Sequence, residues 1–192
     1  REGIDWTHSI RLRADYQRQN GSTSREQFAA SYEPRWQFDE NIFAYGLAQY
    51  ERDRIQGFSS RYSVSGGLGY RVVDNPELKL SLKAGPAYRV TDFTNGTSAD
   101  GFAGLVGLDF DWQMLERLKL TQDVEALAET GAEATLIFDG ANTTINLVTG
   151  LDFRVSHRLR SRLSYKVEYD SNPPAGSEGT DTLTRATLIY GF

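Results

Sequence analysis

Apolar and polar residues alternate with a period of two along nearly the whole chain, and this pattern constrains the fold more than any other feature. The cleanest run is 78–91, whose alternate apolar positions are Leu78, Leu80, Leu82, Ala84, Pro86, Tyr88 and Val90. A period of two places successive side chains on opposite faces of a β-strand, whereas a helix repeats every 3.6 residues. The pattern therefore predicts an all-β fold.

Ten segments carry this alternation, and polar or Gly- and Pro-containing turns separate them. The segments are 5–19, 27–38, 42–53, 61–72, 78–91, 102–112, 118–126, 145–155, 159–169 and 182–192. The longer connections are 20–25, 53–60, 92–100, 129–142 and 170–180, and they alternate with short ones. Up-and-down membrane barrels alternate short periplasmic turns with longer outer loops. We therefore predict an antiparallel up-and-down transmembrane β-barrel of about ten strands, with 1–192 as a single domain.

The last segment, 182–192, ends on Phe192, with Tyr190 two residues before it. This ending resembles the closing strand of bacterial outer-membrane barrels. The resemblance implies that the barrel-assembly machinery reads Tyr190 and Phe192 as an assembly signal, and that Phe192 marks the periplasmic end. Closing a barrel removes exposed strand edges. We expect this strand to pair with the first strand of the barrel, which is either 5–19 or a strand ahead of Arg1.

Composition excludes several classes of protein. The chain has a net charge of −5 and a mean hydropathy of −0.50, and no apolar run approaches the ~18 residues of a membrane helix. The absence of Cys excludes a disulfide framework and Cys-based metal sites. Mild acidity without a Lys/Arg block argues against a nucleic-acid partner. No secretory signal peptide is recognisable at the start, so we expect a mature or trimmed chain.

Alternation alone does not say which face of the strands is outward, because a soluble barrel would turn its apolar face inward. The expected segments run to about 10–14 residues, against ~9–11 needed to cross a bilayer and ~5–6 in an average globular strand. Aromatic residues lie near segment ends, as in interfacial girdles: Trp6, Tyr16, Trp36, Phe38, Tyr62, Phe110, Trp112, Tyr169 and Phe192. In a membrane the charged face must line the lumen, because an Arg or Lys facing mid-bilayer lipid costs roughly 2–4 kcal/mol.

The lumen-facing positions carry charges of both signs, and we expect them to form a paired network that fills the lumen. The predicted network is Arg11, Arg13, Arg71, Lys83, Arg89, Asp109, Asp111, Asp123, Glu125, Arg154, Arg162, Lys166, Glu168 and Arg185. An alternative is that the four acids between 109 and 125 gather into a cation site. The many bases on the same face favour ion pairing instead. No metal or other cofactor is expected.

Catalytic residues are not indicated. The two histidines are predicted to lie at the membrane interface (His8) and in a short turn (His157), and neither accompanies a plausible nucleophile. The glycines of 66–69 precede no helix, so they do not form a nucleotide-binding loop. They are expected to relieve crowding in the lumen or to let the strand bend.

Two of the expected strands depart from a regular alternating pattern. Pro34 lacks a backbone N–H and is expected to break the strand ladder locally. In 42–53 it is ambiguous which alternate positions form the apolar face. Phe43, Tyr45 and Leu47 occupy one set of positions and mostly small residues occupy the other, but Tyr50 falls among the small residues.

Three motifs carry a further resemblance. Residues 50–54 read Y-E-R-D-R, 66–71 read G-G-L-G-Y-R, and 84–89 read A-G-P-A-Y-R. With the Asp181-Thr182 start and Tyr-Gly-Phe end of the last segment, these are similar to the salt-induced outer membrane protein family, a bacterial family defined by a domain of unknown function. The resemblance covers essentially the whole chain. It implies an integral outer-membrane barrel of Gram-negative bacteria, a link to salt stress and no catalytic residue.

One feature departs from that family. Its members usually carry a further N-terminal hairpin with a Gly-Asn-Thr turn, which has no match here. Either two strands precede Arg1 in the intact barrel, giving twelve, or this version closes with ten.

Three functions remain open from the sequence. The first is a non-enzymatic outer-membrane barrel that acts in envelope integrity, salt-stress response or as a scaffold. The second is a narrow channel for small anionic solutes, because Arg and Lys outnumber acids at the inferred lumen positions. The third is a module whose outer loops bind a surface protein. Lipid, lipopolysaccharide and the barrel-assembly machinery are the other expected partners.

Overall fold

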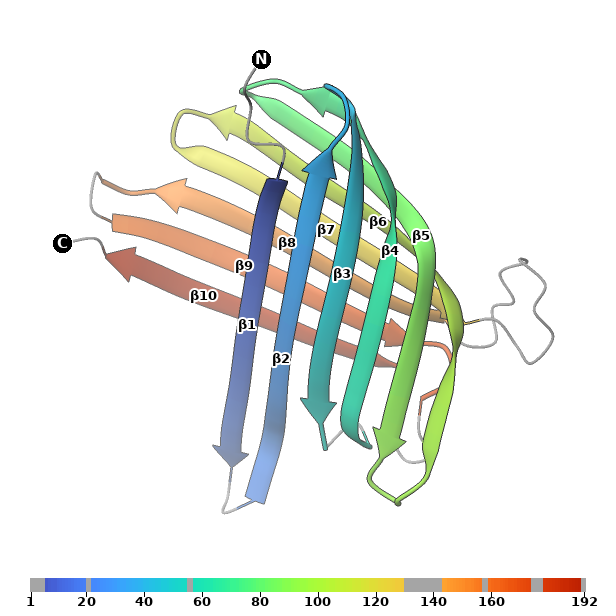
Figure 1. The fold of residues 1–192 in the computed structure, drawn as a ribbon. Helices are drawn as coiled ribbons and strands as arrows, with labels where there is room; N and C mark the ends of the chain where they lie inside the picture. Colours follow the sequence, from blue (N-terminus) through green and yellow to red (C-terminus); the bar gives the residue numbers. More distant parts are fainter. Residues whose placement is uncertain are drawn as a thin grey trace.

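The described part of the chain forms ten antiparallel strands joined in a single strongly curved sheet (Figure 1). The computed structural model describes residues 6–19, 22–54, 57–129, 143–156, 159–173 and 178–190, and only the backbone of 15–19, 22–26, 189 and 190. The strands are β1 (Trp6–Gln19), β2 (Ser22–Gln37), β3 (Ile42–Asp53), β4 (Phe58–Asp74), β5 (Leu78–Phe93), β6 (Ser98–Leu115), β7 (Leu118–Glu129), β8 (Thr143–Arg154), β9 (Leu159–Asp170) and β10 (Thr180–Tyr190). The predicted all-β class, antiparallel order and ten strands are confirmed.

Each strand pairs with its neighbours in sequence, which makes the sheet a simple meander from β1 to β10. The sheet curls so that β1–β5 face β6–β10 across an interior, called the lumen below (Figure 1). Among the described residues, β1 pairs only with β2 and β10 only with β9. The expected pairing of the last strand with β1 is therefore absent from the described ladders, and the sheet is an open, curled half-barrel.

Several strands extend further than the sequence predicted. The expected loops 20–25, 53–60 and 92–100 shrink, because β2 begins at Ser22, β4 at Phe58 and β6 at Ser98. Beyond Thr91 the β5–β6 ladder continues through the polar pair of Asp92 with Ser98. These residues form strand without an apolar face, so the period-two signal does not report them. The loop expected at 170–180 remains between β9 and β10, and most of 129–142 lies outside the described residues.

The apolar face of the sheet points outward. Bulky side chains on it are widely exposed, including Ile10 at 71%, Leu12 at 73% and Leu68 at 60%. Side chains at the alternate positions point into the lumen, where Glu33, Lys83 and Arg89 are buried. A soluble barrel would bury the first set and expose the second, so the structure supports the face assignment made for a membrane barrel. No helix in the described part of the chain is long and apolar enough to cross a membrane.

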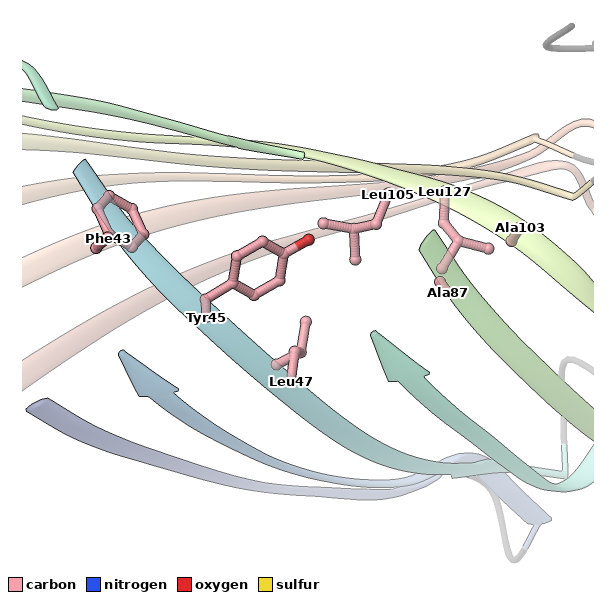
Figure 2. Packing of buried hydrophobic residues seen from close by; sticks show 7 residues of the cluster. All are labelled: Phe43, Tyr45, Leu47, Ala87, Ala103, Leu105 and Leu127. Atoms are coloured by element: carbon pink, nitrogen blue, oxygen red, sulfur yellow. The ribbon is translucent and has the colours of Figure 1, made fainter. Parts of the chain in front are cut away.

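Strand β3 is the exception, and it resolves the ambiguous phase. Its bulky residues Phe43, Tyr45 and Leu47 are buried in the lumen, and the small set faces outward. They pack with residues from β5, β6 and β7: Ala87, Ala103, Leu105 and Leu127. Figure 2 shows the Tyr45 ring pointing from β3 toward Leu105. The expectation that charged pairs fill most of the lumen therefore needs correction, because an apolar cluster shares it.

Proline and glycine shape the wall of the curl where strands bend. The β2–β3 ladder is interrupted at Glu33 and Pro34 and resumes in the same register, which confirms the predicted break. The β4–β5 ladder has a similar gap opposite Pro86. There a Cβ on Gly67 would lie 2.1 Å from the Ala84 carbonyl oxygen, so only glycine permits this close backbone approach.

Candidate functional site

A buried ion-pair cluster crosses the lumen and joins opposite walls of the curl. At its centre the Lys83 ammonium on β5 donates to Glu33 Oε2 on β2 at 2.6 Å and to Glu125 Oε1 on β7 at 2.8 Å. Lys83 and Glu33 are 3% and 1% exposed. The Lys83 ammonium also lies 5.5 Å from the centre of the Tyr45 ring, which brings it beside the apolar cluster.

Arg35 on β2 connects this cluster to a further strand, β6. Its guanidinium donates to Glu33 on its own strand and to Asp109 on β6. Gln49 on β3 donates to the second oxygen of Glu125 at 3.0 Å. The cluster thus consists of two cations and three carboxylates with a polar amide, and we call Glu33, Arg35, Lys83, Asp109 and Glu125 the lumen cluster.

The local sequence makes room for the long lysine side chain. Gly107 lies directly opposite Lys83 in the β5–β6 ladder. A Cβ at Gly107 would lie 2.4 Å from Lys83 Cε, so any other residue would displace the side chain. Gly69 serves Phe43 in the same way, with a Cβ position 2.1 Å from the ring. The expectation that the glycines of 66–69 relieve lumen crowding is confirmed at Gly69, and Gly107 makes room for Lys83 in the same way.

The lumen cluster forms one boundary of a cavity of about 530 Å³. Gln49, Asp109 and Glu125 line it on the cluster side, and Asp170 and Glu178 line it where β9 connects to β10. The cavity therefore lies between the lumen cluster and the end of the sheet opposite Trp6 and Tyr190.

Charges of both signs line this cavity. Its six basic residues are Arg11, Arg13, Arg61, Arg89, Arg162 and Lys166. Its eight acidic residues are Glu51, Asp109, Asp123, Glu125, Glu168, Asp170, Glu178 and Asp181. Among the described lining residues the acids are therefore in excess. The anion-channel hypothesis rested on an excess of Arg and Lys over acidic residues in the lumen, and the residues that line this cavity do not have that excess.

Other predicted network residues form separate pairs along the wall. Lys166 pairs with Glu168 on β9, and Arg162 lies 3.5 Å from Asp152 on β8. Asp111 pairs with Lys119 at 3.2 Å, whereas Asp109 pairs with Arg35 and Glu125 pairs with Lys83. The structure thus divides the predicted network into a central cluster and local pairs.

The remaining predicted residues lie at the margins. Arg71 lies 3.6 Å from Asp74, near the turn that leads into β5. The side chains of Arg154 and Arg185 are exposed, on β8 and β10. Of the proposed assembly signal, Tyr190 is described only as the last residue of β10, and Phe192 lies outside the described residues.

Sequence reasoning missed two residues at the centre of the cluster, Glu33 and Arg35. Both alternate with the apolar residues of β2, so the period-two pattern already placed them on the polar face. Their role depends on contacts with β5 and β6, at sequence separations of 50 and 74 residues. A single sequence carries no signal for contacts of that kind.

Metal-binding and catalytic arrangements are not found in the described part of the chain. No group of three or more His, Asp or Glu there is placed to hold a metal ion. His8 is exposed on the outer face, where Nδ1 lies 2.9 Å from the Tyr32 hydroxyl and its ring stacks on Trp6. His157 lies outside the described residues.

Comparisons with known proteins identify one family and one relative by sequence. The model of the family described as "Protein of unknown function, DUF481" matches residues 1–192. "Uncharacterized protein YdiY" from Escherichia coli (strain K12) is 25% identical over 174 residues, which are 90% of this chain. The chain spans 65% of that relative's length.

The fold is also similar to that of a solved porin, described as "NanC porin structure in rhombohedral crystal form". The TM-score is 0.56, and the match covers 97% of this chain and 93% of the porin at 7% identity. The chain therefore shares a porin-like β-barrel fold. Neither the family description nor these two names specifies an enzymatic activity.

Proposed function

The chain belongs to the family described as "Protein of unknown function, DUF481", and we propose that it is a non-enzymatic, single-domain outer-membrane β-barrel of Gram-negative bacteria. Its lumen is closed by the lumen cluster, and it acts as a scaffold or in envelope integrity. The observation that carries this proposal is the distribution of polarity, with apolar side chains exposed outside and a charged cluster buried inside.

The outer face supports a membrane location through its two aromatic girdles. One lies at the Trp6 end and contains Trp6, Trp36, Phe38, Tyr70, Trp112 and Phe153. The other lies at the opposite end and contains Phe28, Tyr50, Tyr62, Tyr88, Phe102 and Tyr169. Along β2, β4 and β6 the girdles are eight to ten residues apart, as in Phe28–Trp36, Tyr62–Tyr70 and Phe102–Trp112.

This spacing fits the apolar band of a membrane barrel. At about 3.3 Å per residue and a tilt of about 40°, eight to ten residues span roughly 20–25 Å across the membrane, close to the ~25 Å band of outer-membrane barrels. Exposed apolar residues fill the interval on the same strands, including Val64, Leu68 and Val106. Monomeric soluble proteins rarely expose a continuous apolar surface of this size.

The lumen cluster supports a closed lumen rather than a wide pore. Lys83, Glu33 and Glu125 bridge strands on opposite walls at hydrogen-bonding distance. Phe43, Tyr45 and Leu105 pack beside them and are almost fully buried. An ion crossing the lumen would have to separate buried ion pairs, which is costly in a low-dielectric interior.

Planar bilayer recordings test this closure with the full-length protein. We expect no discrete openings with the native sequence, because the buried bridges remain intact. Regular single-channel openings would contradict the closed barrel. The protein is added at a defined protein-to-lipid ratio, and protease protection confirms that it has inserted. An absence of current then reflects a closed lumen and not failed insertion.

A second candidate is a narrow channel for small anionic solutes, and the cavity of about 530 Å³ is the observation that favours a solute path. The mixed lining argues for weak selectivity between anions and cations. If openings occur, the reversal potential in a salt gradient measures that selectivity. A cation-selective current would rule out the anion channel.

The physiological role and partners rest on the sequence resemblance and on the proposed location. We propose a part in the salt-stress response, contact with outer-membrane lipid and lipopolysaccharide, and assembly through the ending at Tyr190 and Phe192. Normal growth of a deletion strain at high salt would count against the stress role. Deleting 129–142 tests an outer-loop protein partner, since unchanged co-purification would remove that region from the interaction.

A further inference from the structure

Two arginines lie at the junction of two cavities in the lumen. In the β4–β5 ladder Arg61 is opposite Thr91, and Arg89 is opposite Ser63, so the arginines are diagonal neighbours on the inward face. Both line the cavity of about 530 Å³ and a smaller one of about 170 Å³. The smaller cavity extends to Phe93, at the end of the sheet opposite Trp6. The two guanidinium groups thus border both spaces.

Arg89 is buried but only partly paired. It is 8% exposed, and its Nη1 donates to Thr144 Oγ1 at 2.8 Å and to Glu129 Oε1 at 3.2 Å. Its Nε is buried and has no hydrogen-bond partner among the residues that the structure describes. Both contacts are made by Nη1, so neither uses the edge of the guanidinium formed by Nε and Nη2. A carboxylate can bind such an edge through two parallel hydrogen bonds. A buried donor without an acceptor is unfavourable, so this edge favours an incoming acceptor.

Arg61 adds a second positive charge that its neighbours hold loosely. Its Nη2 is 3.6 Å from Asp170 Oδ2, and its Nε is 3.4 Å from Thr91 Oγ1. The Arg61 guanidinium carbon lies 4.1 Å from the centre of the Phe58 ring. This contact holds the guanidinium against the ring and leaves the N–H groups at its edge able to donate hydrogen bonds. Glu129 and Asp170 balance the two arginines, so recognition at this junction depends on hydrogen-bond geometry more than on net charge.

We propose that Arg89, assisted by Arg61, binds the carboxylate group of a small solute, with the Nε–Nη2 edge of Arg89 making the bidentate contact. The larger cavity has room for the rest of the molecule, since its volume falls within the range of small-molecule pockets, about 300–1,000 Å³. The carboxyl groups that also line it favour a solute whose remaining part is neutral or positively charged. Binding does not require ions to cross the lumen cluster, so the inference goes beyond the proposed closed barrel.

Nuclear magnetic resonance of ¹⁵N-arginine-labelled, detergent-solubilised full-length protein tests the site. The probe is acetate, titrated at constant ionic strength against sodium chloride, with inorganic phosphate in a parallel titration. We expect a saturable shift of the Arg89 Nε resonance, identified by its loss in Arg89→Lys, and no such shift with chloride. Absence of a saturable acetate shift would overturn the site. Tighter binding of phosphate than of acetate would overturn carboxylate as the ligand group.

The Arg89→Lys variant separates the bidentate contact from simple charge. Lysine keeps the positive charge but lacks the planar fork, so acetate affinity, followed at the Arg61 Nε resonance, should fall at least about tenfold. Arg71→Lys is the matched control, because Arg71 lies at the other end of the lumen beside Asp74, and it should bind as the native chain does. Equal affinity in native protein and Arg89→Lys would contradict the proposal, provided both give the same β-sheet circular dichroism spectrum.

Discussion

Replacing Lys83 by Met removes the cation that ties β5 to β2 and β7 across the lumen. The methionine fills much of the same volume, but Glu33 and Glu125 lose charge-assisted hydrogen bonds of 2.6 and 2.8 Å. Each such bond contributes about 1.5–3 kcal/mol, and part of that is offset because the lysine no longer needs to be desolvated. Breaking a buried pair by removing one partner typically costs about 3–5 kcal/mol. We expect the free energy of unfolding to fall by about that amount.

The assay is urea-induced unfolding in lipid vesicles, followed by the fluorescence of the three tryptophans, all of which lie in one aromatic girdle. Lys79→Met is the control, since Lys79 is largely exposed and its nitrogen lies 3.5 Å from Asp74, and it should cost less than about 1 kcal/mol. Adding Glu33→Gln to Lys83→Met should restore part of the loss, because glutamine needs no counter-charge. A loss for Lys83→Met as small as that for Lys79→Met would refute the idea that the lumen cluster holds the two walls together.

Three further substitutions test the glycines and the outer face. Gly107→Val puts a side chain within 2.4 Å of Lys83 Cε and should cost about 1–3 kcal/mol in the same unfolding assay; Gly101→Ala, with nothing within 4 Å, should cost clearly less. Gly67→Ala collides with the Ala84 carbonyl oxygen and should lower the folded yield measured by protease resistance, whereas a similar yield to Gly66→Ala, where the nearest contact is 3.5 Å, would contradict the backbone argument. Val106→Arg faces outward between the girdles and should destabilise the vesicle-inserted protein by roughly 2–4 kcal/mol; no loss would argue against lipid contact at this position.

The period-two pattern was sufficient to predict most of the fold. It located ten strands and assigned Leu82 and Lys83 to opposite faces, because alternation is a local property that each strand carries in its own sequence. It also anticipated the ladder break at Pro34, since proline cannot donate a ladder hydrogen bond. Strand ends were less accurate, because polar residues such as Ser98 and Asp100 extend the ladder beyond the apolar band.

The candidate site could be predicted only in part. Lys83, Asp109 and Glu125 were placed in the lumen because each occupies the polar face of its own strand. Which charges meet depends on how strongly the sheet curls, and that curl brings β2 against β5, β6 and β7. Sequence periodicity does not encode this distance, so Glu33 and Arg35 were missed.

The sequence by itself determined that the chain forms antiparallel strands with one apolar and one charged face. For a membrane barrel the sequence also placed the apolar face outward. Tertiary structure alone decided that β3 turns Phe43, Tyr45 and Leu47 inward, and that Lys83 bridges opposite walls of the lumen. The physical reason is that the two faces of a strand follow from its own extended backbone, and pairing involves only strands that are neighbours in the chain. Closure of the lumen requires contacts between strands far apart in the chain, and these exist only once the sheet has curled.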